Sequence, residues 1–346
     1  MTPLVVVDAD VLGRRRTGDE TYVRNLLREL APLAGEAGIR LAAVTRAPEL
    51  VPAGVEALAL ATRSQELRMA LTLPRLLRRV GASLCHTQYA VPLRPPCPCV
   101  VTVHDLSFAR EPGLMGWKDR IVFRAVVPRA ARRAARVLTV SERTKRDLVE
   151  LYGVPAEKVV VTPNGVDPAF SPTPTDGPRD NVAQGDYALA VGAIQRRKNQ
   201  VAALEAATSA GLRLVVAGPE KDPAIAAELR SRGAQLEGYV ETDRLAELYR
   251  HAACLVQPSR YEGFGLPVLE AMASGTPVVA VHEPALVEVA GDAAVFVDEG
   301  DLAEGIRRAI DDREQLVAAG LERARAFTWR ASAERTLAVY REILGT

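Results

Sequence analysis

The stretch AACLVQPSRYEGFGLPVLEAMASGTPVVAV, residues 252–281, holds two short apolar runs with a helix-like segment between them. The run AACLV predicts one buried strand and the run PVVAV predicts another. Pro267 suits the first turn of a helix that begins between the two runs. Two buried strands joined by a helix are typical of a parallel sheet with helical crossovers. The stretch therefore predicts an α/β fold.

The same alternation of apolar runs and amphipathic segments extends over the whole chain and restarts after residue 184. A stretch rich in Pro, Gly and polar residues, 163–186, interrupts it and is typical of a linker. We therefore predict two doubly wound, Rossmann-like domains, residues 1–167 and residues 168–328. A last helix, 329–346, follows the second predicted sheet and could pack on either domain.

Composition indicates a soluble globular protein, because 48% of the 346 residues are hydrophobic and 25% are charged. The first apolar run, Leu4–Val7, is too short for a signal peptide or a membrane span, so a cytoplasmic location is expected. The four cysteines show no paired spacing, which favours a reducing compartment over a disulfide framework.

Charge is divided unevenly along the chain. Residues 1–168 hold 25 Lys and Arg against 17 Asp and Glu, a net charge of +8, and residues 169–346 hold 19 against 26, a net charge of −7. Arg129, Arg132, Arg133 and Arg136 recur at helical spacing and predict one cationic stripe. Such a stripe could bind a phosphate-bearing substrate or anionic lipid, or be a solvated helix face. Nucleic acid is disfavoured, since no aromatic residue interrupts the stripe.

Ligands of open parallel sheets bind beyond the carboxyl ends of the strands, so residues that follow strands are the candidates for chemistry. Gly192 ends the run YALAVG, and Arg196, Arg197 and Lys198 come shortly before a predicted helix. Cations at the start of a helix can neutralise a diphosphate. A solvated surface run is the alternative interpretation of these three residues.

Two glutamates, Glu262 and Glu270, lie on the two sides of the turn formed by residues 263–266. Glycines in that turn allow backbone amides to approach a ligand, and a helix start favours an anion. A carboxylate can accept hydrogen bonds from both hydroxyls of a vicinal diol, so one glutamate suits a ribose and the other a hexose. Alone, Glu270 could be an ordinary glutamate stabilised by the helix dipole.

The segment EGFGLPVLEAMASGTPVV, with its glutamates eight positions apart, resembles the retaining nucleotide-sugar glycosyltransferases of family 4, which have the two-domain GT-B fold. Further matches follow in family order over nearly the whole chain: VDADVLGRRRTGDETYVRNLL, CHTQYAVPL, VVTVHDLSF, VSERTKRDL, TPNGVD, VGAIQRRKN, LVVAGP, LEGYV, EVAGDAAVFVD and FTWRASAERTLAVYREIL. The resemblance implies that the first domain binds the acceptor and the second binds the donor. It also implies that the helix starting at Trp329 crosses back to the first domain.

The resemblance assigns a role to each matching position. On the donor side, it implies that Arg197 and Lys198 bind the diphosphate, with Gly192 also on this side, and that Glu270 binds the ribose. It implies that Tyr239 and Val240 contact the base, and that the hexose is bound by Glu262 and the amides of Gly263, Phe264, Gly265 and Leu266. In the first domain, it implies that His104 contacts the transferred sugar or acceptor and that the loop at Gly18 contacts the diphosphate or acceptor.

Each candidate in the first half has a plain alternative. His104 could be a structural histidine at a strand end, and Gly18 could serve only the turn before a helix, with Asp19 as its cap. His86 follows a strand and is a weaker candidate for the site. The sequence Asp8-Ala9-Asp10 has the DxD pattern of metal-binding glycosyltransferases, but no further acidic or histidine ligand lies near it in the sequence.

We therefore expect a retaining glycosyltransferase of family 4 that needs no metal or other cofactor. The resemblance implies GDP-mannose as donor, with a UDP-hexose such as UDP-glucose as the second choice. The acceptor would be a hydroxyl of a glycan, glycolipid or lipid diphosphate, with possible contact with the inner membrane face. A non-catalytic partner of the same fold and a nucleotide-sugar epimerase are the alternatives. A donor-hydrolysis assay would decide the first, and sugar analysis after incubation without acceptor would reveal the second.

Overall fold

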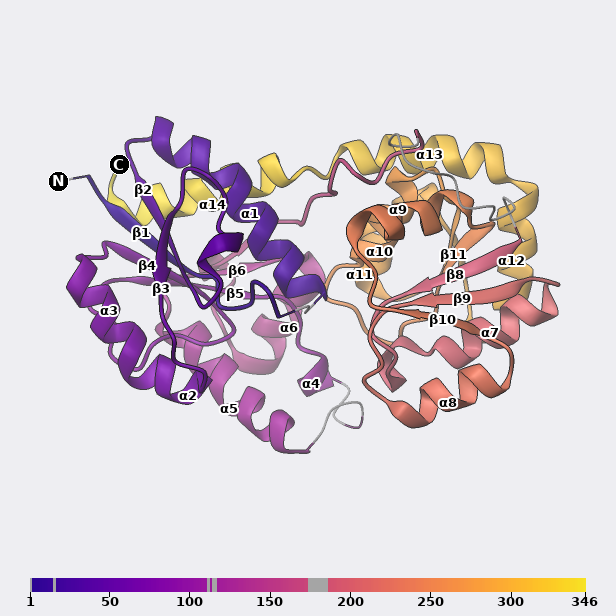
Figure 1. Ribbon diagram of the computed structural model, residues 1–346, viewed down its shortest axis with the longest axis horizontal. Helices are drawn as coiled ribbons and strands as arrows, with labels where there is room; N and C mark the ends of the chain where they lie inside the picture. Colours follow the sequence, from indigo (N-terminus) through magenta and orange to yellow (C-terminus); the bar gives the residue numbers. More distant parts are fainter. Residues whose placement is uncertain (1, 15–16, 111–112, 114–116, 174–185) are drawn as a thin grey trace. The chain divides into compact units, whose positions relative to one another are not determined.

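The computed structural model describes residues 2–14, 17–110, 113, 117–173 and 186–346, which form two compact units (Figure 1). Unit 1 comprises residues 1–165 and 328–346, and unit 2 comprises residues 166–327. The expected domain limits lie within two residues of these bounds. Most of the expected linker, residues 174–185, falls outside the described residues.

Unit 1 is built on a seven-stranded sheet in the order β3-β2-β1-β4-β5-β6-β7. All neighbouring strands pair in parallel. The strands are β1 (Leu4–Asp8), β2 (Arg40–Thr45), β3 (Glu56–Ala59), β4 (Leu84–Gln88), β5 (Cys99–Val103), β6 (Arg136–Thr139) and β7 (Val159–Val161). Both β1 and β5 are buried along their full length, as expected for central strands covered on both faces.

The helices of unit 1 include the last helix of the chain. They are α1 (Thr17–Glu36), α2 (Gln65–Leu67), the π-helical turn η2 (Arg68–Thr72), α3 (Leu73–Val80), α4 (Ser107–Arg110), α5 (Trp117–Arg133), α6 (Glu142–Tyr152) and α14 (Trp329–Leu344). Helix α14 packs against α1 (Figure 1). The buried His86 side chain lies 2.5 Å from the Tyr340 hydroxyl and 2.7 Å from the Thr102 hydroxyl, which ties α14 to the sheet.

Unit 2 has a six-stranded sheet in the order β10-β9-β8-β11-β12-β13, again with parallel neighbours. The strands are β8 (Tyr187–Val191), β9 (Arg213–Ala217), β10 (Gln235–Gly238), β11 (Cys254–Gln257), β12 (Val278–Val281) and β13 (Val295–Val297). The helices are α7 (Gln200–Ser209), α8 (Pro223–Ser231), α9 (Thr242–His251), α10 (Leu266–Ala273), α11 (Pro284–Ala290), α12 (Leu302–Asp311) and α13 (Arg313–Arg325). The prediction of two α/β domains with parallel sheets is confirmed.

Two expectations about local secondary structure in unit 1 are wrong. Arg136 does not continue the helix of Arg129, Arg132 and Arg133, because α5 ends at Arg133 and Arg136 starts β6, where it pairs with Val100 of β5. Its guanidinium forms an ion pair with Glu342 of α14. The cationic stripe is therefore shorter than the spacing suggested.

The segment at Gly18 is helical, because α1 begins at Thr17. Asp19 consequently lies inside the first turn and is not the cap. With Glu20 it places two acidic side chains at the helix start, where they interact favourably with the helix dipole.

Among the described residues, no helix combines the length and the apolar character required to span a bilayer.

Candidate active site

The carboxyl ends of β8, β9 and β10 in unit 2 are packed together through glycine backbones. Gly192, Gly218 and Gly238 all have positive φ values, +131°, +149° and +67°. A Cβ on Gly218 would lie 2.2 Å from the carbonyl oxygen of Gly192, and the Gly218 amide donates to the Gly238 carbonyl at 2.7 Å. Only glycine allows strand ends to approach this closely in these conformations.

Because Gly192 has no side chain, the Lys198 side chain can pass close to it at the edge of the sheet. A Cβ at Gly192 would lie 3.3 Å from Cε of Lys198, closer than a side chain tolerates without a shift. Arg196, Arg197 and Lys198 form one 3₁₀ turn, η5, between β8 and α7. Asn199, with φ +54°, then redirects the chain into α7. The turn holds both Arg197 and Lys198 at the carboxyl end of β8.

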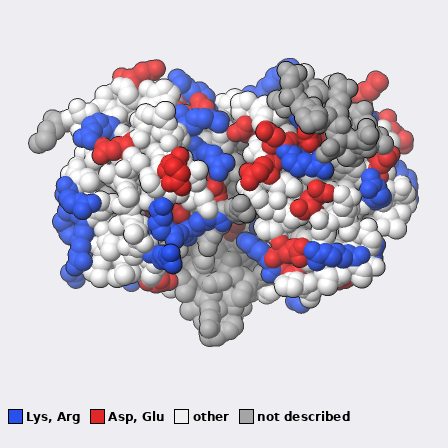
Figure 2. All heavy atoms as spheres, viewed as in Figure 1, with Lys and Arg blue, Asp and Glu red and all other residues white. Residues whose placement is uncertain are grey.

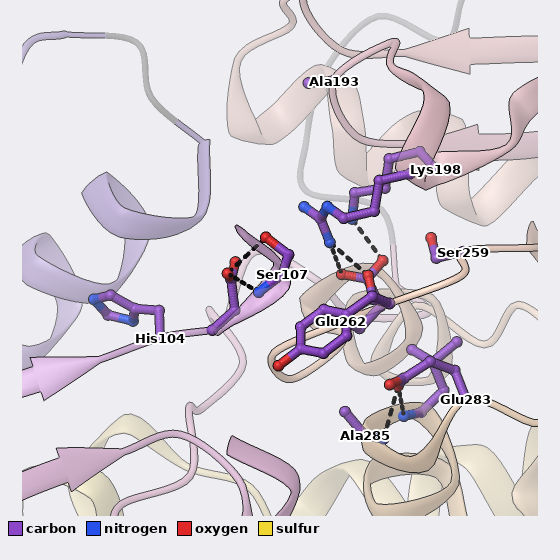
Figure 3. A network of polar contacts seen from close by, with 12 residues as sticks. His104, Ser107, Ala193, Lys198, Ser259, Glu262, Glu283 and Ala285 are labelled. Carbon is purple, nitrogen blue, oxygen red and sulfur yellow. Dashed lines mark hydrogen bonds and ion pairs between the residues drawn. The ribbon is translucent and has the colours of Figure 1, made fainter. Parts of the chain in front are cut away.

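Arg197 and Lys198 converge on the carboxylate of Glu262 (Figure 3). The Lys198 ammonium lies 2.6 Å from Oε1 of Glu262, and the Arg197 guanidinium lies 3.2 Å from Oε2. Arg197 also donates to the Tyr261 carbonyl at 2.6 Å. The structure thus joins two cations from one loop with one buried anion from another. We call these three residues the Lys198–Glu262 cluster.

Glu262 stays ionised although it is buried. Burial alone raises the pKa of its carboxyl group, but the charges of Lys198 and Arg197 and the side-chain hydrogen bonds of Lys198 and Ser259 lower this pKa to about 2. The Gln257 side-chain amide, at the end of β11, donates to the same Oε1 at 2.7 Å. Both carboxylate oxygens are therefore held by hydrogen bonds in the described structure.

Helix α11 supports the turn from Glu262 to Leu266 through a close contact with Gly265. Gly265 has φ +107°, and a Cβ there would lie 2.7 Å from the Leu286 side chain. Leu286 is held at the start of α11, where the buried Glu283 carboxylate accepts hydrogen bonds from the amides of Ala285 at 2.7 Å and Leu286 at 3.2 Å (Figure 3). Phe264 is buried beside Phe327, with ring centroids 5.9 Å apart. The glycines thus bring the turn close to its support.

Glu270 lies on α10, eight positions after Glu262, and it is also buried. Its Oε2 accepts a hydrogen bond of 2.9 Å from the Tyr249 hydroxyl of α9. Burial raises the pKa of Glu270 to about 7, the Tyr249 hydrogen bond opposes this change, and the negative charge of Asp167 adds to it. The two glutamates thus differ in charge behaviour: Glu262 is always ionised near neutral pH, and Glu270 titrates there.

Tyr239 and Val240 directly follow β10, so they lie at the same sheet edge as Gly192 and Glu262. Tyr239 is among the exposed large side chains of the chain, and Val240 is partly exposed. Unit 2 therefore carries all the residues predicted to bind the donor except Gly18, and it places them at or after strand ends or, for Leu266 and Glu270, on α10.

In unit 1, His104 follows β5 and is almost fully buried. Its Nε2 lies 3.1 Å from Gln88 Oε1, and its ring packs edge-on against Tyr22 with centroids 4.7 Å apart. Burial lowers the pKa of His104, against the charges of Asp19 and Asp105, which favours the neutral ring. Gly18 is exposed in the first turn of α1. Its Cβ position meets no heavy atom within 4 Å.

His86 is a structural residue. Its side chain is fully buried between Tyr340 and Thr102, and burial, with a smaller effect of His104, lowers its pKa to about 3. The weak expectation that His86 faces the site is therefore wrong, because the strand register turns this side chain toward α14.

The DxD pair is neutralised by arginines. Arg68 forms ion pairs with Asp8 and, at 3.4 Å, with Asp10; Arg46 lies 2.8 Å from Asp10, and Arg14 also pairs with Asp10. Within the described ranges, no group of three or more potential metal ligands is found. Asp8 and Asp10 thus serve as the anions of a buried ion-pair cluster at the end of β1.

Sequence reasoning missed Gln257 and Tyr249. Gln257 is a polar residue at a strand end, so the rule that identified Gly192 could have identified it. Tyr249 lies 21 residues before Glu270 on another helix. Only the packing of α9 against α10 brings the two together.

Comparison with known proteins gives the family. A family described as Glycosyltransferase Family 4 matches residues 16–170, and one described as Glycosyl transferases group 1 matches residues 179–325. O-antigen chain mannosyltransferase B of Escherichia coli is 31% identical over 266 residues, which are 70% of this chain and 70% of that protein. The chain belongs to glycosyltransferase family 4.

Other relatives of this glycosyltransferase have different printed activities. The D-inositol 3-phosphate glycosyltransferase of Acidothermus cellulolyticus is 33% identical over 279 residues, 71% of this chain and 62% of that protein. The MMP alpha-(1->4)-mannosyltransferase of Mycolicibacterium hassiacum is 32% identical over 273 residues, 71% of this chain and 66% of that protein. The matched regions thus span between about three fifths and about seven tenths of these relatives.

Solved structures agree on the fold. A sucrose-phosphate synthase from Thermosynechococcus elongatus superposes with a TM-score of 0.76 at 22% identity, covering all of both chains. Anabaena Alr3699/HepE in complex with UDP-glucose gives a TM-score of 0.75 at 15% identity, covering 99% of this chain and 100% of that one. At these identities the likeness shows the GT-B fold of this family 4 glycosyltransferase and nothing about its substrates.

Proposed function

We propose that this glycosyltransferase moves a hexosyl group from a nucleotide diphosphate sugar to a hydroxyl group of a glycan, glycolipid or lipid-diphosphate acceptor, with retention of configuration. The Lys198–Glu262 cluster carries the proposal, because two cations are fixed at a sheet edge beside the glycine turn and Glu270. Mannosyltransferases among the relatives favour GDP-mannose as donor. UDP-glucose is the second candidate.

In the proposed reaction, the bond between C1 of the hexose and the diphosphate oxygen breaks, and a bond forms between C1 and the acceptor oxygen. The acceptor proton passes to the departing phosphate on the same face of the sugar. Lys198 and Arg197 stabilise the negative charge that develops on that phosphate. Glu262 is a poor nucleophile here, since its oxygens are held by Lys198, Gln257 and Arg197 and its pKa is about 2. We therefore assign it to the hexose hydroxyls.

The remaining positions keep the roles that the family resemblance implies, as proposals. The amides of Gly263 to Leu266 would face the hexose, Tyr239 and Val240 the base, Gly192 the diphosphate, and His104 and the segment at Gly18 the transferred sugar or the acceptor. We also propose that no metal is needed. The charge that a metal would supply is present on Arg197 and Lys198, and the arginine partners of Asp8 and Asp10 occupy these carboxylates.

The direct test of the function is incubation with GDP-mannose or UDP-glucose and a hydroxyl acceptor, with product analysis by NMR. The proposal expects an α-linked product from an α-linked donor. The absence of both transfer and donor hydrolysis would instead support the non-catalytic alternative, and interconversion of the donor sugar without acceptor would support the epimerase alternative.

Replacing Glu270 with Gln is expected to weaken the binding of GDP-mannose or UDP-glucose by at least about tenfold at pH 8. The reason is that a neutral amide accepts fewer and weaker hydrogen bonds from the ribose than a carboxylate does; bonds to charged groups contribute about 1.5 to 3 kcal/mol. Isothermal titration calorimetry measures the change. Glu247→Gln, on the partly exposed face of α9, is the matched control. Equal affinities for wild type and Glu270→Gln would remove the ribose role.

We further propose that unit 1 contacts an anionic membrane surface, the cytoplasmic face of the inner membrane. Leu67, Leu71 and Leu93 are exposed by 47%, 44% and 47%. The Leu93 amide donates to the Met69 carbonyl at 2.9 Å, and Arg133 donates to the Leu93 carbonyl at 2.7 Å, so leucines and arginines share one surface. Basic side chains also line the edge of this unit near α3 in Figure 2. Exposed leucines beside arginines suit anionic lipid.

A double variant, Leu71→Glu with Leu93→Glu, is expected to reduce co-sedimentation with phosphatidylglycerol vesicles at least about fivefold, because it removes apolar contact and adds negative charge. Leu151→Glu changes another exposed leucine of unit 1 and serves as control. Wild-type binding that is equal on neutral phosphatidylcholine vesicles, or absent on both, would contradict a charge-dependent contact.

A further inference from the structure

Tyr249 is a buried side chain whose hydroxyl reaches the carboxylate of Glu270. It lies on α9 with no exposed surface, and its hydroxyl is 2.9 Å from Oε2 of Glu270. An ionised carboxylate has no proton to give, so the tyrosine hydroxyl is the donor in this pair. Among the described residues, it is the side chain that donates to Glu270.

The position of Tyr249 is fixed by its surroundings. Its ring packs edge-on against Phe170 with centroids 5.7 Å apart. Its backbone carbonyl accepts a hydrogen bond of 2.6 Å from the Thr276 hydroxyl, in the turn that joins α10 to β12. Helix α9 is thereby attached to the middle of α10 and to the turn that follows it. The hydroxyl cannot turn away from Glu270 without disturbing this packing.

The charges around Glu270 make this hydrogen bond important. Burial and the carboxylate of Asp167, which lies between β7 and β8, both disfavour the ionised form of Glu270. Tyr249 is the group in the described structure that acts in the opposite direction. The phenol itself stays protonated, since burial and the neighbouring Glu270 raise its pKa well above the usual value. Tyr249 therefore donates over the whole working pH range.

We infer that Tyr249 is a positioning residue for donor binding: its hydroxyl holds Oε2 of Glu270 by a hydrogen bond, so that Oε1 can accept hydrogen bonds from the ribose diol. This inference rests on the proposed ribose role of Glu270. It adds a residue that the diphosphate and hexose contacts do not involve. It also makes donor affinity dependent on pH near neutrality.

The sign of the pH dependence follows from the direction of the shift. If the diol binds the ionised form, donor affinity is full above a pH of about 7 and falls as the pH decreases through that value. Loss of the Tyr249 hydrogen bond disfavours the charged form further, which moves the midpoint upward. A shift of about one pH unit would weaken binding about fivefold at pH 7 and much less at pH 8.5.

The experiment measures the affinity for GDP-mannose and for UDP-glucose by calorimetry from pH 5.5 to 8.5. Both phosphates of a nucleotide sugar are fully ionised in this range, so the ligand does not contribute to the profile. The variants are Tyr249→Phe and Glu270→Gln. Tyr187→Phe is the control, because Tyr187 is another buried tyrosine of unit 2, whose hydroxyl donates to the Leu248 carbonyl at 2.7 Å. Thermal melts verify that each variant is folded.

The inference expects an upward shift of the midpoint in Tyr249→Phe alone, and a flat profile in Glu270→Gln. A second readout, titration of ¹³C-labelled glutamate side chains by NMR, should show the same shift for Glu270 without ligand. An unchanged Glu270 midpoint, or equal weakening at every pH, would overturn the role of Tyr249. If the Glu270 midpoint shifts upward in Tyr249→Phe as expected but Glu270→Gln binds the donor with wild-type affinity, the ribose assignment is overturned instead, and with it this part of the proposed function.

Discussion

Replacing Lys198 with Ala should lower kcat by about 10²-fold to 10³-fold, the largest catalytic effect that we expect of any single side chain in unit 2. Removal of one well-placed charge that stabilises a developing anion costs about 3 to 4 kcal/mol in transition-state energy. Lys198 is well placed in this sense. Its stem passes Gly192, its ammonium lies 2.6 Å from Glu262, and only about a tenth of its side chain is exposed.

The same substitution leaves the buried Glu262 with a single cationic partner, so its effect on folding must be separated from its effect on catalysis. Thermal melts of Lys198→Ala and the wild type measure the former. Lys221→Ala removes an exposed lysine of unit 2 and should leave turnover unchanged. A folded Lys198→Ala enzyme that retains wild-type kcat would exclude Lys198 from stabilising the leaving group.

Replacing Gly218 with Ala should produce the largest loss of stability. The new Cβ would lie 2.2 Å from the carbonyl oxygen and 2.5 Å from the carbonyl carbon of Gly192, and both are backbone atoms. The hydrogen bond to the Gly238 carbonyl holds Gly218 from its other side. Its φ of +149° adds strain for any side chain. We expect the free energy of unfolding to fall by at least about 4 kcal/mol.

Gly211→Ala is the matched control for this prediction. Gly211 also has a positive φ, +79°, but its Cβ position meets no heavy atom within 4 Å. The free energy of unfolding of Gly211→Ala should therefore fall by only about 1 to 2 kcal/mol, the cost of a side chain in this backbone conformation. Urea unfolding curves compare the two variants. If Gly218→Ala shifts the midpoint no more than Gly211→Ala does, the close contact of the strand ends does not limit stability.

The fold was predictable because its signals are local. Each buried strand, such as β11 before the glycine turn, is an apolar run, and each crossover helix follows at a typical distance. Arg136 shows where local signals fail. Its spacing from Arg129, Arg132 and Arg133 is helical, but pairing of β6 with β5 determines its conformation. The start of α1 was missed because Gly18 suggested a turn, while the acidic residues after it favour a helix start.

The site was predictable where its residues follow strands in sequence, as Gly192, Lys198 and Glu262 do. The partners that determine charge were not predictable in this way. Tyr249 meets Glu270 through helix packing, and Arg46 and Arg68 reach Asp10 from 36 and 58 residues away. A DxD pattern in sequence carries no information about such arginines. The protonation behaviour of the site therefore emerges only from tertiary structure.

The central claim is that unit 2 binds the nucleoside diphosphate through Lys198 and Arg197 without a metal ion. A crystal structure of the protein grown with GDP-mannose or UDP-glucose in the presence of EDTA tests it most directly. The account predicts diphosphate oxygens at about 3 Å from both cations, with the ribose on Glu270. A nucleotide bound away from these side chains, or bound only after Mg²⁺ is restored and with the ion on Asp8 and Asp10, would contradict it.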